Sequence, residues 1–193
     1  MRRRAFDALA STAGLVLAAV LLVAGGLLLW GHSFVDNQVS TQLSAQKIVF
    51  PTTSNPEFKA LPAADAAAMG QYAGQTMTTG AQAKVYADNF IGVHLSKMGG
   101  TYAELSGKAL AQPNNAALQA QVNTVFKGTT LRGMLLDAYA FWQMGEIAFW
   151  GAIVSFIGAG ILLVLSAFGL YHARRVSPAA EILSPQTPAH IAS

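Results

Sequence analysis

Two long windows of the chain contain no Asp, Glu, Lys or Arg. The first runs from Ala8 to Val35 around "LVLAAVLLVAGGLLLW", and the second runs from Ile147 to Ala173 around "FIGAGILLVLSAFGLY". A helix needs about 20 apolar residues to cross a hydrocarbon core of about 30 Å. Both windows are longer than that, and the rest of a 193-residue chain cannot wrap two buried helices of this kind. The pattern therefore predicts two transmembrane helices, over residues 8–31 and 147–171.

Helical periodicity continues beyond the first window. Val35, Val39 and Leu43 recur at intervals of four, which places them on one face of a helix. The first membrane helix is therefore expected to extend outward for a few turns. Pro51 and Pro56 in "VFPTTSNPEF" then predict a loop.

The clearest helix outside the apolar windows is "TTGAQAKVYADNFIGVHLSKMGG". Thr79 is a suitable N-cap, and Gly99-Gly100 predicts the end of the helix. The next segment, "TYAEL", reads as a capping box with Thr101 at the cap and Glu104 three residues later.

A further helical pattern restarts at Asn114 or Asn115 and continues into the second window, with Gly128 and Gly133 as places for a bend. We see no long strand alternation, so the expected fold is all-α, with two transmembrane helices flanking a small helical bundle. The predicted order is a cytoplasmic N-terminus at 1–7, a transmembrane helix at 8–31, an extracytoplasmic domain at 32–146, a transmembrane helix at 147–171, and a disordered cytoplasmic tail at 172–193.

Basic residues predict the orientation. Lys and Arg beside membrane spans mark the cytoplasmic side, and here they cluster at the two ends, as Arg2, Arg3, Arg4, Arg174 and Arg175. Both termini are therefore expected in the cytoplasm of a multi-pass protein of the cell membrane. Residues 33–146 carry seven basic and seven acidic side chains, so the net charge of +3 belongs to the ends. It suits anionic lipid headgroups and argues against nucleic acid as a partner.

A cleavable signal peptide is the alternative for the first window. "MRRR" has the basic character of such a leader, and "GHS" at 31–33 is a weak cleavage pattern. The apolar run through Trp30 exceeds the usual 7 to 15 residues of a leader, which favours an uncleaved anchor.

Aromatic residues mark the expected membrane interfaces. In "AFWQMGEIAFWG", Trp142, Glu146 and Trp150 are four apart and share a helix stripe. Trp and Tyr prefer the headgroup level, so Trp30, Trp142 and Trp150 are expected at the outer surface and Tyr171 at the inner one. Glu146 then lies at the outer edge of the membrane, near the headgroup level. A role for Glu146 as an intramembrane proton or cation ligand is the alternative.

Small residues within the windows predict close helix contacts. Gly151, Ser155 and Ala159 are four apart in the second window, and Ala10, Gly14 and Ala18 have the same spacing in the first. In an antiparallel hairpin these two stripes occupy opposite halves of the membrane. They are therefore candidates for contact with another copy or another membrane protein. The plainer interpretation is that Gly and Ala are common in membrane spans.

Candidate chemistry is sparse. The chain has no cysteine, and its four histidines, His32, His94, His172 and His190, lie in separate segments. His94 has Met98 one turn later, but no haem-attachment motif accompanies them, and chance spacing explains the pair. Metalloprotease, hydrolase and nucleotide-binding motifs are missing from the sequence. We therefore predict no catalytic, cofactor-binding or metal-binding residue.

The segments "QKIVFP", "TTGAQAKVYADNFIGVHL" and "TLRGMLLDAYAFWQMGEIA" resemble a group of uncharacterised two-span membrane proteins of high-GC Gram-positive bacteria. Some proteins of this appearance carry the label of aromatic ring-opening dioxygenase. Such an enzyme needs an iron site built from histidines and a carboxylate, and the central segment offers one histidine, His94. The resemblance therefore implies the two-span architecture and no activity.

These patterns favour a non-catalytic membrane protein that presents a helical extracytoplasmic domain to a protein partner or to a second copy, as an accessory or scaffold subunit surrounded by membrane lipids. An ectodomain that senses a ligand and signals through a separate protein is the alternative. An enzyme acting on lipids or cell-wall precursors is a third hypothesis.

Overall fold

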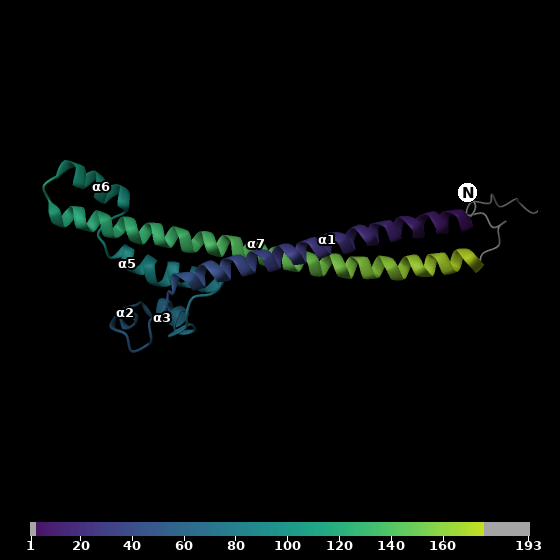
Figure 1. Ribbon diagram of the computed structural model, residues 1–193, viewed down its shortest axis with the longest axis horizontal. Helices are drawn as coiled ribbons and strands as arrows, with labels where there is room; N and C mark the ends of the chain where they lie inside the picture. Colours follow the sequence, from purple (N-terminus) through teal and green to yellow (C-terminus); the bar gives the residue numbers. More distant parts are fainter. Residues whose placement is uncertain (1–2, 176–193) are drawn as a thin grey trace, which may run out of the picture. The chain divides into compact units, whose positions relative to one another are not determined.

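The computed structural model describes residues 3–175, and this part of the chain is helical apart from its loops (Figure 1). Among these residues, Val49 and Thr76 form an isolated antiparallel β-bridge. The all-α prediction is confirmed for these residues. Arg2 and the tail from residue 176 onward lie outside them. The helices are α1 (Arg3–Gln46), α2 (Pro56–Lys59), α3 (Ala63–Gly70), α4 (Gly80–Tyr86), the π-helix η1 (Ala87–Ile91), α5 (Gly92–Ser96), α6 (Tyr102–Ala111) and α7 (Ala116–Arg175).

The chain divides into two compact units. The paired-helix unit comprises Met1–Trp30 and Ala148–Ser193, and the middle unit comprises Gly31–Ile147. The expected extracytoplasmic domain, 32–146, has nearly the same limits as the middle unit. Both long helices contribute to both units, because α1 ends at Gln46 and α7 begins at Ala116.

Both α1 and α7 are long enough and apolar enough to cross a membrane. Only 11% of the most apolar window of each helix is buried within the protein, whereas the core helix of a soluble protein would be mostly covered. Large apolar side chains point away from the protein along both segments of the paired-helix unit; they include Val16, Val23, Leu27, Val154, Ile161, Leu165 and Phe168.

Within the paired-helix unit, α1 and α7 pack antiparallel. Gly151 lies against Leu28, Gly158 against Leu21, and Gly169 against Ser11. In each pair the two residue numbers sum to 179 or 180, so the register is constant along the contact. Glycine is needed where the helices are closest, because a methyl group on Gly25 would lie 2.9 Å from the ring of Phe156.

The buried positions of this helix pair repeat every seven residues. They are Ser11, Ala18 and Gly25 on α1, and Ala152, Ala159, Ser166 and Ala173 on α7. A seven-residue repeat corresponds to 3.5 residues per turn, the period of left-handed coiled-coil packing. From the sequence, the contact was expected at residues four apart. The seven-residue repeat was missed because Ser and Ala also occur between its members.

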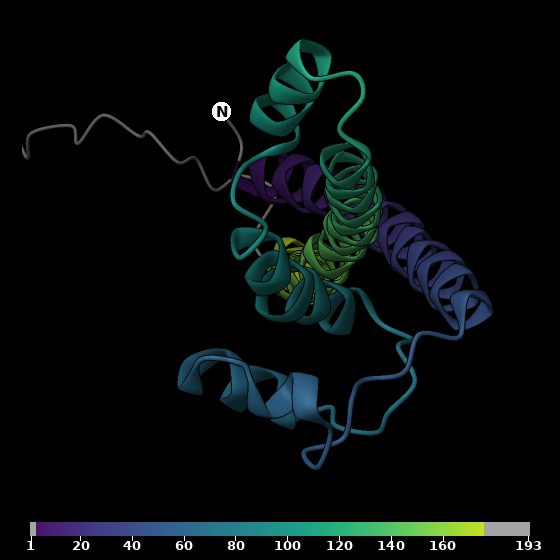
Figure 2. The same cartoon turned by 90° about the vertical axis from the view of Figure 1, so that its left-hand side faces the viewer.

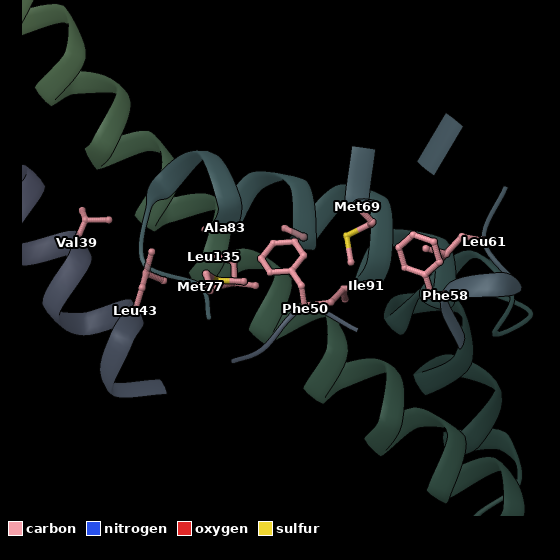
Figure 3. Packing of buried hydrophobic residues seen from close by; sticks show 11 residues of the cluster. Val39, Leu43, Phe50, Phe58, Leu61, Met69, Met77, Ala83, Ile91 and Leu135 are labelled. Carbon is pink, nitrogen blue, oxygen red and sulfur yellow. The ribbon is translucent and has the colours of Figure 1, made fainter. Parts of the chain in front are cut away.

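The middle unit has its own hydrophobic core. Figure 3 shows Val39 and Leu43 of α1, Leu135 of α7, and Phe50 and Met77 of the intervening segment, which belong to one cluster. Phe50, Met69 and Met77 are fully buried. The remaining core residues come from α2 to η1 and the loops between them: Phe58, Leu61, Ala83, Ala87 and Ile91. The stripe Val35, Val39, Leu43 therefore continues α1 as predicted and supplies one wall of this core.

The α4–η1–α5 segment lies between α3 and α7 (Figure 2). It begins at Thr79, which forms a capping box with Gln82, as its predicted N-cap role requires. The predicted helix is present over Gly80–Ser96, but its residues 87–91 form a π-helix, which the sequence pattern did not predict. Gly99 and Gly100 end the segment with φ angles of +74° and +158°, a conformation that glycine adopts without strain.

Helix α6 starts with the predicted capping box between Thr101 and Glu104. Asn115 precedes α7, and its side chain accepts a hydrogen bond from the Leu118 N–H at 3.1 Å. Helix α7 then runs to Arg175 with no interruption at Gly128 or Gly133, where a bend was expected. Gly128 instead allows Leu95 to pack closely against α7, because a methyl group at position 128 would lie 2.8 Å from the Leu95 side chain.

Candidate functional site

The best-formed hollow of the middle unit is a groove between the end of α1 and residues 131–141 of α7. Its volume is about 580 Å³. We call it the α1–α7 groove. Ten of its fourteen lining residues are apolar: Phe34, Val35, Val39, Leu43, Ile48, Leu131, Met134, Leu135, Ala138 and Phe141. The other four are Gln38, Gln42, Gln46 and Asp137.

The groove has a buried floor and exposed walls. Val39, Leu43 and Leu135 form the floor and belong to the core. Phe141 and Met134 stand at the walls, with 60% and 64% of their surfaces exposed. Large apolar side chains exposed together in this way make the groove a candidate binding surface.

Three glutamines follow one edge of the groove. Gln38, Gln42 and Gln46 are four apart on α1, so they form an exposed polar stripe beside the apolar one. A glutamine amide both donates and accepts hydrogen bonds. Asp137 is the charged residue among those that line the groove. The groove therefore combines an apolar floor with neutral hydrogen-bonding side chains and one carboxylate along its edges.

The turn after α1 fixes one end of the groove. Lys47 has a φ of +52°, which reverses the chain and directs Ile48 back toward the core. The Ile48 carbonyl accepts a hydrogen bond from the Met77 N–H at 2.8 Å. This contact ties the end of α1 to the segment before α4, so Ile48 is held in place by backbone as well as by packing.

A second, more open hollow of about 720 Å³ lies between α5, α6 and α7. Its charged groups are already engaged in packing. Arg132 donates from Nε to the Ala87 carbonyl at 3.2 Å and from its guanidinium to Asp88 at 2.7 Å. Glu104 belongs to the capping box of α6. These contacts give the second hollow a structural explanation, and the α1–α7 groove is the stronger candidate.

Asp88 connects η1 to its surroundings. It accepts a hydrogen bond from Lys84 at 2.6 Å and one from Arg132 at 2.7 Å. Partial burial by itself would raise the pKa of Asp88, but the hydrogen bonds from Lys84 and Arg132 and the charges of these residues outweigh it, so the pKa lies below its ordinary value. Asn89 holds the next turn by donating to Asp65 at 2.7 Å.

Asp88→Asn is expected to lower the stability of the middle unit at neutral pH by about 1 kcal/mol, since the ion pairs are partly exposed and screened. A lowered pKa in the folded state stabilises the fold above the ordinary pKa, and this contribution disappears as the pH falls through the folded-state pKa. The protection factors of residues 80–96 in hydrogen exchange, which are corrected for the intrinsic pH dependence of exchange, should therefore fall for the unsubstituted chain below about pH 4, and less so for Asp88→Asn. Asp36→Asn, on the exposed side of α1, is the control. Equal acid sensitivity of the unsubstituted chain and Asp88→Asn would contradict the assignment.

His94 is placed by its own helix. Its Nδ1 lies 2.7 Å from the Phe90 carbonyl oxygen, and its ring packs against the Phe90 ring in a tilted arrangement with centroids 4.5 Å apart. A carbonyl only accepts, so Nδ1 carries the proton and donates. Among residues 3–175 no three His, Asp or Glu side chains are grouped for metal binding. His94 therefore packs against Phe90, and it belongs to no group of three potential metal ligands among residues 3–175.

The predicted interface residues fall in different surroundings. Trp30 and Trp150 are exposed, with 68% and 62% of their surfaces accessible, and Tyr171 is exposed as well. Trp142 instead packs against the core of the middle unit, close enough to Gly80 that a methyl group there would lie 2.6 Å from its Cγ. Glu146 is half-buried. The shared stripe of Trp142, Glu146 and Trp150 is therefore not one continuous exposed surface.

At the other end of the paired-helix unit, Arg175 lies over the ring of Tyr171, 4.5 Å from its centroid. His172 Nε2 is 3.9 Å from Asp7 Oδ2. Arg4 and Arg174 are exposed.

Of the predicted small residues, Ala159 is fully buried, Gly151 contacts Leu28, and half-buried Ser155 donates to the Gly151 carbonyl at 2.8 Å. Gly151 therefore contacts α1 of the same chain, and Ala159 is buried within this helix pair.

No family model, curated protein or solved structure matches this chain. The functional proposal therefore depends on the geometry of the chain itself. The sequence pattern of Val35, Val39 and Leu43 predicts the apolar side of the groove, but not the groove itself. The signal that was overlooked is the glutamine repeat at 38, 42 and 46, which indicates a second, polar face along the same helix.

Proposed function

We propose that this is an integral membrane protein of the two-span type that its sequence resembles. In this proposal, α1 and α7 cross the cell membrane with both termini in the cytoplasm. They hold a small helical bundle, residues 32–146, outside the cytoplasm. The bundle binds a protein partner, so the chain acts as a non-catalytic accessory or scaffold subunit. The observation that carries the proposal is the joining of two lipid-compatible helices to a folded middle unit with apolar side chains left exposed.

Support for the membrane placement comes from the surface of the paired-helix unit. Its core consists of small residues that repeat every seven positions, and its large apolar residues are outside. This is the reverse of a soluble helix pair and suits a lipid environment. The exposed Trp30 and Trp150 at one end, and Tyr171 with its arginines at the other, fit the two headgroup levels.

Support for a protein partner comes from the hairpin of α6 and the start of α7. Tyr102 and Phe126 are exposed, and their rings touch with centroids 5.5 Å apart. Leu110 is 84% exposed. The hairpin is held together from within by buried Leu105, Ala109 and Val125, so these outer residues are not needed for its core. Lys108 and Lys127 on the same hairpin are exposed, so it fits a partner surface that is apolar with acidic residues around it.

A single Leu110→Cys variant tests placement and partner together, because the chain has no cysteine. A membrane-impermeant reagent that carries a maleimide and a photoreactive group is added to intact cells. We expect it to label the new thiol at position 110 and, after irradiation, to capture one protein in constant ratio. Adding Phe126→Glu should abolish the capture while leaving the labelling unchanged, since it places a charge in the apolar contact.

Two matched single-cysteine variants serve as controls for this experiment. Lys59→Cys on α2 should be labelled without capturing that protein, and Ser177→Cys should be labelled only after the cells are opened. Labelling at position 177 but not at position 110 in intact cells would overturn the topology. If Leu110→Cys were labelled but captured the same proteins as Lys59→Cys, the partner surface would be overturned and the topology would stand.

A ligand-sensing ectodomain is the second candidate, and the α1–α7 groove favours it. Its volume of about 580 Å³ lies within the range of roughly 300 to 1000 Å³ typical of small-molecule sites. An enzyme acting on lipids or cell-wall precursors has no comparable support among the described residues, where no grouped acid, base and nucleophile accompanies the groove.

A further inference from the structure

We propose that Asp7 on α1 and His172 on α7 form a pH-sensitive latch, which closes the end of the paired-helix unit when His172 is protonated and loosens it when His172 is neutral. The latch joins the start of α1 to the end of α7, which lie side by side (Figure 1). In the orientation proposed above, this end faces the cytoplasm. The latch itself depends on neither that orientation nor a protein partner.

Both residues occupy the contact faces of the helix pair. Asp7 stands seven residues before Gly14 and fourteen before Leu21, and both of these face α7. Gly158, which lies against Leu21, stands fourteen residues before His172. The numbers of Asp7 and His172 sum to 179, which is the register of Leu21 with Gly158. The seven-residue packing of the two helices therefore ends on a pair of ionisable side chains.

One carboxylate oxygen of Asp7 lacks a partner. The Oδ2 atom is buried and accepts no hydrogen bond, and a buried carboxylate oxygen is costly unless it is hydrogen-bonded. His172 Nε2 is 3.9 Å away, close enough for an ion pair but too far for a hydrogen bond. The His172 side chain is 53% exposed, whereas that of Asp7 is 20% exposed. His172 can therefore exchange its proton with the solvent and move toward Oδ2.

The proton on His172 decides whether this gap closes. A protonated imidazole donates from both ring nitrogens, so Nε2 can donate to Asp7 Oδ2 in a charge-assisted hydrogen bond of about 2.7–2.9 Å. A neutral imidazole donates from one nitrogen and carries no charge, so it attracts the carboxylate less. Histidine changes its charge between about pH 5 and 8. Protonation and closure favour each other, so the latch closes as the pH falls and loosens as the pH rises.

The other charges at this end do not change over the same pH range. The charged residues within one turn of the pair are Arg3, Arg4, Arg174 and Arg175. An arginine side chain stays protonated in proteins. Arg175 lies over the Tyr171 ring, and His172 is the basic side chain paired with Asp7 among residues 4–175. The pH-dependent step between pH 5.5 and pH 8 therefore belongs to His172.

Hydrogen exchange of the purified full-length chain in detergent micelles tests the latch. Protection factors, corrected for the intrinsic pH dependence of exchange, are compared at pH 5.5 and pH 8 for residues 8–14 and 166–175. We expect them to be about three- to tenfold higher at pH 5.5, as for a partly exposed hydrogen bond between charged groups. Residues 18–28, farther along the same helix pair, should show no such difference. His94→Gln, in the other unit, should leave the difference unchanged.

Substitutions of the pair separate the latch from general effects of pH. Asp7→Asn and His172→Gln should each remove the difference and leave low protection at both pH values. His172→Lys carries a cation at both pH values, so its protection should stay high at pH 8. A difference that persists in Asp7→Asn, or that is missing from the unsubstituted chain, would overturn the latch. Equal protection of His172→Lys and His172→Gln at pH 8 would show that charge on residue 172 does not close it.

Discussion

Oxidation of a chain carrying Gly14→Cys and Ser166→Cys is expected to join α1 to α7 by a disulfide within one molecule. A Cβ atom at position 14 would lie 3.7 Å from the Cβ of Ser166, and disulfides span Cβ–Cβ distances of about 3.5 to 4.5 Å. The unsubstituted chain has no cysteine, so the background is clean. The measurement is the mobility of the monomer on a non-reducing gel, together with a mass lower by two hydrogen atoms. We expect nearly complete conversion.

A second pair and a control define the register. Ser11→Cys with Gly169→Cys has a corresponding distance of 3.5 Å and should form an equally efficient bond. Gly26→Cys with Ser166→Cys should remain reduced, because no atom outside its own helix lies within 4 Å of a Cβ at position 26. A covalent dimer in place of the internal bond would mean that the seven-residue repeat pairs helices of different copies, one of the contacts for which the sequence made the small residues candidates.

Gly80→Ala is expected to destabilise the middle unit by about 1 to 3 kcal/mol, the usual cost of overpacking a well-filled site. The added methyl group would lie 2.6 Å from Trp142 Cγ, and the close atoms of Trp142 are near the backbone of α7, so no flexible side chain can move aside. The change in the free energy of unfolding is measured by urea titration in detergent, with unfolding monitored through hydrogen exchange of residues 80–96.

Gly107→Ala in α6 provides the matched control for Gly80→Ala. Nothing lies within 4 Å of a Cβ at position 107, and the residue is exposed within a helix. Alanine has the higher helix propensity, so the substitution should stabilise by up to about 1 kcal/mol. If Gly80→Ala stabilised the middle unit as Gly107→Ala is expected to do, the close contact between α4 and Trp142 would not exist.

The helices were largely predictable because their signals are local. Thr79 with Gln82 and Thr101 with Glu104 cap helices through neighbours within one turn, so the sequence contains the whole interaction. The stripe of Val35, Val39 and Leu43 likewise lies on one helix, and the structure extends α1 through it. The π-helix is instead contacted by Arg132, 44 positions after Asp88, and no local pattern reveals that contact.

The candidate groove depends on pairing two segments about a hundred residues apart. Gln42 and Ala138 each lie within a predicted helical pattern, but nothing in either pattern brings the two helices together. Trp142 illustrates the same limit. Its neighbours in sequence are aromatic and suggest a headgroup belt, whereas contact with Gly80 across the fold makes it part of the core.

The five-residue π segment at 87–91 has a consequence for how this region tolerates changes in length. In a π-helix each turn holds one residue more than in an α-helix, because the hydrogen bonds run from i to i+5; the Gly92 N–H accordingly reaches the Ala87 carbonyl. Deleting one residue there would restore the ordinary backbone ladder and leave the downstream residues facing nearly as before, because the π turn holds one residue more than an α-helical turn. His94 and Leu95 would then stay near Phe90 and Gly128. The same deletion in a regular α-helical turn would rotate everything downstream by about 100°.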